Sequence, residues 1–176
     1  VKQLLKAGAS YRGEQGEGKA PLLWASSKGH KETVLVLLDA GADANKKNKA
    51  GTTPLLSSLE NNAEDTAMLL LNGGANPNVK RKDSLTPLIL AARSGLVRVV
   101  KELIAKGVVI DEVDTSSRTA LWYAANEGKS GVVKILLQKS ANNHIADAGG
   151  HIPFMRAVIH GHVDIVKEMI GHGVDI

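Results

Sequence analysis

The stretch SLTPLILAARSGLVRVVKELIAKG, residues 84–107, contains the pattern that decides the fold. Near its start lies Thr86-Pro87, where the threonine hydroxyl can cap free backbone N–H groups and proline fits the first position of a helix. Gly95 follows the first apolar run and can adopt the left-handed conformation that ends a helix. A second apolar run then continues to Gly107. The stretch therefore predicts two short helices joined by a tight turn.

The same pattern recurs along the chain at an interval of 33 residues, since Pro21, Pro54, Pro87 and Pro153 are separated by 33, 33 and 66 residues. Helices shorter than about 12 residues are marginal in water. Neighbouring units must therefore cover one another's apolar faces. The predicted inward stripe of the first helices consists of leucine and alanine: Leu22, Ala25, Leu55, Leu88, Ala91, Ala92, Leu121, Ala124 and Ala125.

The segments GTTPLLSSLENNAEDTAMLLLNGGANPN (51–78), SLTPLILAARSGLVRVVKELIAKG (84–107) and KAPLLWASSKGHKETVLVLLDAGADAN (19–45) resemble the ankyrin repeat. The resemblance implies an all-α ankyrin repeat solenoid, in which each repeat is a helix-turn-helix followed by an extended loop or β-hairpin. One departure is systematic, because the histidine that ankyrin repeats usually place after Thr-Pro-Leu is replaced. Its positions hold Leu23, Leu56, Ile89, Trp122 and Met155.

The repeat boundaries predict one ankyrin array over residues 1–176. It comprises a partial repeat at 1–14, full repeats at 15–47, 48–80, 81–113 and 114–146, and a nearly complete repeat at 147–176. Because the sequence starts in the middle of a helical pattern and stops in a loop, we expect a segment of a longer array.

Composition narrows the class of protein. The chain has no cysteine, which excludes disulfides and thiol catalysis and fits a reducing environment. We therefore expect an intracellular, cytoplasmic protein, with the nucleus or the cytoplasmic face of a membrane as alternatives. No run approaches the roughly 18 apolar residues that a membrane helix needs. We accordingly expect no direct membrane insertion.

The resemblance implies a non-catalytic module that binds a partner protein or peptide on its concave face, as an adaptor or scaffold. The alternative is a regulatory or docking region of a larger enzyme or ion channel. The net charge of +4 permits a partner with an acidic segment. Nucleic acid is not expected, because no aromatic residues interleave with the basic ones.

Cofactor and metal motifs are weak in this sequence. A Gly-x4-Gly-Lys pattern at 13–19 lacks the following Ser or Thr, since Ala20 stands there. Two of the six histidines, His30 and His162, occupy the same repeat position four periods apart. Their shared position in the repeat explains that pair of histidines, so we expect no metal site, no cofactor and no catalytic residue.

Partner-binding residues are predicted on the exposed stripe of the first helices, because residues three and four apart share a helix face. Trp24 and Tyr123 are the strongest candidates, since Trp, Tyr and Arg dominate binding hot spots. Alternatively, these rings pack against neighbouring loops in place of the missing histidine. The predicted residues are Trp24, Lys28, Glu60, Asn61, Leu90, Arg93, Trp122, Tyr123, Asn126, Glu127, Arg156 and His160.

Charged loops give a second set of candidates. A basic patch is predicted from two neighbouring loops, with a solvated edge as the alternative: Lys46, Lys47, Lys49, Lys80, Arg81 and Lys82. The next loop carries Asp111, Glu112 and Asp114, so the sign of the charge reverses. Asn45 and Asn78 occupy the position that the resemblance implies can be hydroxylated by an asparaginyl hydroxylase. Their other expected role is bonding to the turn backbone.

Overall fold

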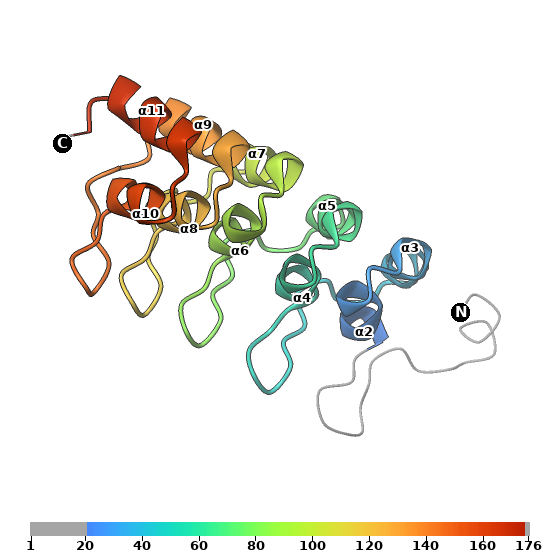
Figure 1. Ribbon diagram of the computed structural model, residues 1–176. Helices are drawn as coiled ribbons and strands as arrows, with labels where there is room; N and C mark the ends of the chain where they lie inside the picture. Colours follow the sequence, from blue (N-terminus) through green and yellow to red (C-terminus); the bar gives the residue numbers. More distant parts are fainter. Residues whose placement is uncertain (1–20, 175–176) are drawn as a thin grey trace. The chain divides into compact units, whose positions relative to one another are not determined.

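A computed structural model describes residues 21–174 of the chain, and the predicted partial repeat at 1–14 lies outside this range. Within it there are ten helices and no strand. The helices come in pairs: α2 (Pro21–Ser27) with α3 (Lys31–Asp39), α4 (Pro54–Glu60) with α5 (Glu64–Asn72), α6 (Pro87–Ser94) with α7 (Val97–Ala105), α8 (Ala120–Asn126) with α9 (Ser130–Gln138), and α10 (Pro153–Ile159) with α11 (Val163–Gly171) (Figure 1). The predicted helix-turn-helix units are confirmed.

The chain forms two compact units, one ending at Lys82 and the other starting at Asp83. In the first unit α2 packs on α4, and α3 packs on α5. In the second, α8 packs between α6 and α10, while α9 contacts both α7 and α11. Each unit thus has a layer of first helices and a layer of second helices. The predicted repeat boundaries and the single array stay predictions.

Threonine caps start three of the first helices, as the sequence predicts. Each hydroxyl oxygen accepts a hydrogen bond from the backbone N–H three residues later, which satisfies a donor that the helix leaves free. The bonds join Thr53 to Leu56 (3.3 Å), Thr86 to Ile89 (3.2 Å) and Thr119 to Trp122 (3.1 Å). Ile152, before α10, has no side-chain oxygen to do the same.

Leucine and alanine build the core of each unit. Every residue of the predicted inward stripe is buried, with exposed fractions from 0% to 5%. Alanine at positions such as Ala91 and Ala124 lets the first helices approach closely, because its methyl group adds little volume. The prediction of the core from the repeat pattern is confirmed.

The loops between helix pairs are tight hairpin turns, not the extended strands of a β-hairpin. Two backbone hydrogen bonds lie within each of three turns, and the one that spans the turn joins Asn48 N to Thr52 O (3.0 Å), Asp114 N to Arg118 O (3.1 Å) and Asp147 N to His151 O (3.0 Å). We call the last two turns the 114–118 hairpin and the 147–151 hairpin. They are joined by a bond from Ala148 N to Ser116 O (2.9 Å), which fixes their spacing.

Ser140 gives a stability prediction, because it holds a left-handed conformation (φ 60°) where the other repeats have glycine. A side chain in this conformation costs roughly 1–2 kcal/mol, and the extra freedom of unfolded glycine offsets part of the gain. Ser140→Gly should therefore raise the free energy of unfolding by about 0.5–1 kcal/mol, measured by urea denaturation.

The reverse change provides the control. Gly107 has the same conformation (φ 74°), and apart from its two chain neighbours no atom of residues 21–174 lies within 4 Å of a Cβ placed there. Gly107→Ser should therefore lower stability through conformation alone, by about 0.5–1 kcal/mol. Equal stability of both variants and the parent would contradict the explanation.

Candidate functional site

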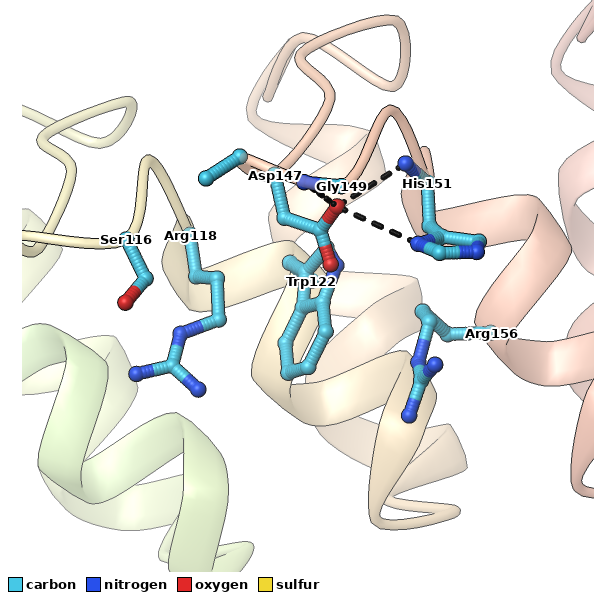
Figure 2. A pocket seen from close by; sticks show the side chains of 8 residues that line it. Ser116, Arg118, Trp122, Asp147, Gly149, His151 and Arg156 are labelled. Carbon is cyan, nitrogen blue, oxygen red and sulfur yellow. Dashed lines mark hydrogen bonds and ion pairs between the residues drawn. The ribbon is translucent and has the colours of Figure 1, made fainter.

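A hollow of about 350 Å³ opens beside Trp122 in the second unit (Figure 2). We call it the Trp122 hollow. Helix α8 contributes Trp122, α10 contributes Arg156, and the two hairpins contribute the other lining residues: Ser116, Arg118, Asp147, Ala148, Gly149 and His151. Its volume lies within the range of about 300–1,000 Å³ that is usual for ligand pockets.

The indole of Trp122 lies between two guanidinium groups, as Figure 2 shows. The Cζ atoms of Arg118 and Arg156 are 5.4 Å and 5.0 Å from the ring centroid, close enough for cation–π attraction. Tyr123 meets the indole edge-on, at 5.2 Å between centroids. Trp122 itself is only 5% exposed, and its Nε1 has no hydrogen-bond partner among residues 21–174.

Asp114 holds Arg118 in place beneath the 114–118 hairpin. Its Oδ2 accepts from Arg118 Nε (2.9 Å), from Arg118 Nη2 (2.7 Å) and from the Tyr123 hydroxyl (2.7 Å). Its Oδ1 accepts from the backbone N–H groups of Ser116 (2.8 Å) and Arg118 (3.0 Å). One carboxylate therefore organises both the turn and the arginine above it.

These contacts shift the pKa values of the group. Burial alone would raise the pKa of Asp114, but the hydrogen bonds from Arg118, Tyr123 and Ser116 outweigh it and lower that pKa. Burial and the bond to the Asp114 carboxylate raise the pKa of Tyr123 to about 12. The predicted acidic loop is therefore wrong in part, because Asp114 is 5% exposed and paired with Arg118.

Arg156 is positioned by side chains of the same unit. Its Nε and Nη2 donate to Asn126 Oδ1 at 2.9 Å and 2.7 Å, and its Nη2 lies 3.2 Å from His160 Nε2. Asn126, Arg156 and His160 were predicted separately on the exposed stripe, and the structure brings these three together. The guanidinium is thus held against the indole.

Asp147 caps its own turn at the rim of the hollow. Its Oδ1 accepts from the backbone N–H groups of Gly149 and His151, both at 2.9 Å, and lies 3.3 Å from His151 Nδ1. Burial raises the pKa of Asp147, but these hydrogen bonds exceed that effect and lower it. Asn48, at the equivalent turn of the first unit, makes two such backbone bonds with an uncharged side chain. The turn therefore needs an acceptor oxygen, not a charge.

Three residues of the predicted exposed stripe are buried, which corrects the prediction. Leu90, Trp122 and Tyr123 are 0%, 5% and 6% exposed. For Leu90 and Tyr123, this helix position lies in a layer where α6 packs on α8 and α8 on α10. Arg118 also covers Tyr123, with its Cζ 4.9 Å from the ring centroid. The alternative, a ring packed against its neighbouring loop, is confirmed for Tyr123.

The other stripe residues lie at the surface or partly buried. Trp24, on α2 of the first unit, is 51% exposed. Four more are exposed: Lys28, Asn61, Glu127 and His160. Arg93 is half-buried, with its Cζ 6.0 Å from the Tyr123 ring centroid. Their roles in binding stay predictions.

The basic patch and the two asparagines belong to the first unit. The five lysines are exposed, but Arg81 is half-buried and forms an ion pair with Glu60. Asn45 bridges two turns, since its Nδ2 donates to Gly74 O (3.0 Å) and its Oδ1 accepts from Asn76 N (2.7 Å). This confirms turn bonding for Asn45. The patch as a binding site and hydroxylation of Asn45 and Asn78 stay predictions.

Between residues 21 and 174, no cluster of three or more His, Asp or Glu side chains could hold a metal ion. In that same stretch, no helix is long and apolar enough to cross a bilayer.

The sequence pointed to neither Arg118 nor Asp147, which line the hollow, and it placed Asp114, which supports the hollow, only in an acidic loop. A signal was present, because positions 48, 114 and 147 carry Asn or Asp five residues before the N-cap residue of a first helix, although the equivalent position 81 carries arginine. Side chains of this type favour turns and bond to backbone two residues on. The position of Arg118 within its turn gave no comparable signal.

Comparison with known proteins identifies the repeat. A family model described as ankyrin repeats (3 copies) matches residues 1–81, 56–147 and 88–176, which together span the chain. No curated protein matches the chain.

Proposed function

Because the chain belongs to the ankyrin repeat family, whose members are generally protein–protein interaction modules, we propose that it binds a partner protein as an adaptor or scaffold. The proposed binding surface consists of the first helices and the hairpin turns. The proposed role is non-catalytic and needs no cofactor. An intracellular location is part of this proposal and rests on the sequence alone.

The Trp122 hollow is the observation that carries the proposal. It gathers one tryptophan and two arginines, the residue types that dominate binding hot spots. Both guanidinium groups are already held by hydrogen bonds to Asp114 and Asn126. A partner would therefore meet side chains whose conformational freedom is already restricted, which reduces the entropic cost of binding.

Helix α2 of the first unit offers a second contact. Trp24 is 51% exposed, although tryptophan usually buries most of its surface in a folded protein. Binding by a partner would remove this apolar ring from water. At about 25 cal/mol per Å² of apolar surface, such burial stabilises a complex by roughly 2 kcal/mol.

The test begins with affinity capture using the whole chain as bait, followed by calorimetry with the purified partner. Arg156→Gln should weaken binding about tenfold or more, because it removes a guanidinium at the hollow. Trp24→Ala should weaken it by a similar factor if the partner spans the first unit.

Lys134→Gln is the matched control, since Lys134 is exposed on the second helix α9. It changes a cation to glutamine as Arg156→Gln does, and it should leave the affinity within about twofold, as expected for a residue outside the interface. Circular dichroism verifies that each variant keeps its helices. Equal affinities of Arg156→Gln, Trp24→Ala and the parent for the captured partner would refute the proposed surface.

A further inference from the structure

We propose that the Trp122 hollow receives the carboxylate of an aspartate or glutamate side chain from a partner protein. The proposal rests on the proposed function and names the chemical group that this part of the surface recognises. It is carried by an unsatisfied buried donor, by the two guanidinium groups beside it and by the balance of charge around the hollow.

The unsatisfied donor is Trp122 Nε1. The indole is 5% exposed, and within the described part of the chain its N–H is the one buried side-chain polar group without a hydrogen-bond partner. Leaving such a donor unpaired costs roughly 1–3 kcal/mol. Buried polar groups of this kind call for an explanation. Nε1 is itself covered by neighbouring atoms, so an acceptor that arrives with a ligand reaches it only as those atoms move aside. A carboxylate oxygen is a strong acceptor for an indole N–H.

The guanidinium groups add charge on both sides of the indole. Arg118 uses Nε and Nη2 to hold Asp114, and Arg156 uses the same two nitrogens to hold Asn126. Nη1 of each arginine takes part in none of these bonds. A guanidinium donating to a carboxylate makes a charge-assisted hydrogen bond, which is about twice as strong as a neutral one. Both arginines can therefore bind an anion without releasing their present partners.

The charges that face the hollow favour the binding of an anion, and one carboxylate opposes it. Arg118 and Arg156 line it with positive charge, and Asp147 is the single carboxylate among the lining residues. Asp114 lies behind Arg118, 5% exposed and bonded to it. His151 on the hairpin and His160 beside Arg156 would add positive charge if protonated. Removing the charge of Asp147 should accordingly strengthen the binding of a carboxylate.

The experiment uses the two indole N–H signals in the NMR spectrum of the whole chain, which has two tryptophans. Trp24→Phe assigns the signal that remains to Trp122. The probe is the peptide acetyl-Gly-Glu-Gly-amide, and its glutamine and lysine counterparts are matched controls at the same ionic strength. The Glu peptide should move the Trp122 signal saturably, as a new hydrogen bond requires. The Gln peptide should bind about fivefold more weakly or worse, because charge assistance is lost.

Two variants test the charges. Asp147→Asn keeps the turn, as Asn48 shows, and should raise the affinity for the Glu peptide by about threefold or more. Arg156→Gln should lower it by about fivefold or more. An unmoved Trp122 signal, an equal response to the Gln peptide, a stronger response to the Lys peptide, or weaker binding by Asp147→Asn would overturn the proposal. Partner capture through other surfaces could still succeed then, so failure here differs from failure of the proposed function.

Discussion

Replacing Asp114 by alanine should lower the free energy of unfolding of the second unit by about 3 kcal/mol. The carboxylate accepts from the Arg118 side chain, the Tyr123 hydroxyl and two backbone N–H groups of the 114–118 hairpin. Alanine would leave these donors without their acceptor. The unpaired Tyr123 hydroxyl accounts for the largest part of this loss, because that residue is 6% exposed, whereas Arg118 can donate to water instead.

The measurement is urea denaturation followed by fluorescence in a Trp24→Phe background, where Trp122 reports on the second unit. Asp114→Asn is the matched control. An asparagine oxygen can accept from the turn N–H groups, as Asn48 does, but it removes the charge that pairs with Arg118. Asp114→Asn should therefore lower the free energy of unfolding by less than Asp114→Ala, by about 1–2 kcal/mol. Equal losses for both variants would show that the charge, and not the turn, carries the whole effect.

The stability of the second unit should also depend on pH at both extremes. The folded pKa of Asp114 is lowered below its ordinary value of 3.8, so its contribution is present above that value and is lost as the pH falls through the folded pKa. The pKa of Tyr123 is raised to about 12, so the contribution of its neutral form is lost as the pH rises from 10 through 12. Melting temperatures of Asp114→Asn and Tyr123→Phe should fall less steeply in the acid and alkaline ranges, respectively. Profiles parallel to the parent would contradict these assignments.

The helices and the core could be predicted because they depend on local rules repeated every 33 residues. The threonine caps, such as Thr86, act within three residues, and they occur where the sequence places them. Leucine and alanine at fixed repeat positions, such as Leu88 and Ala91, are buried because every unit packs by the same geometry. Of the predicted extended loop or β-hairpin, no strand forms within residues 21–174, since only two backbone hydrogen bonds lie within each of these turns.

The candidate site was only partly predictable, because it depends on residues that differ from repeat to repeat. Arg118 and Arg156 come from different repeat positions, yet both lie against Trp122. Helical spacing placed Arg156 on the face of its helix that meets Trp122. It could not show that Arg118 folds back from its hairpin over the rings, because that position is held by Asp114 through side-chain bonds and not by a repeated rule.

Trp24 and Tyr123 illustrate the same limit and give the other large stability effect. They stand three periods apart at one repeat position, and the sequence predicts the same exposed role for both. The structure separates them, with exposed fractions of 51% and 6%. Tyr123→Ala should therefore lower the free energy of unfolding by about 3–4 kcal/mol. It leaves a cavity where the buried ring was and removes the hydroxyl that donates a hydrogen bond to Asp114. Trp24→Ala should change it by no more than about 0.5 kcal/mol, as surface substitutions do.

Urea denaturation followed by circular dichroism measures both variants, because it does not depend on the tryptophan that is removed. Tyr123→Phe keeps the ring between Arg118 and Trp122 and loses only the hydroxyl bond to Asp114, so it should cost about 1 kcal/mol. The order Tyr123→Ala, Tyr123→Phe, Trp24→Ala follows from burial and hydrogen bonding and not from residue type. A loss for Trp24→Ala as large as that for Tyr123→Ala would mean that Trp24 is a core residue. It would then be unsuited to the binding role proposed for α2.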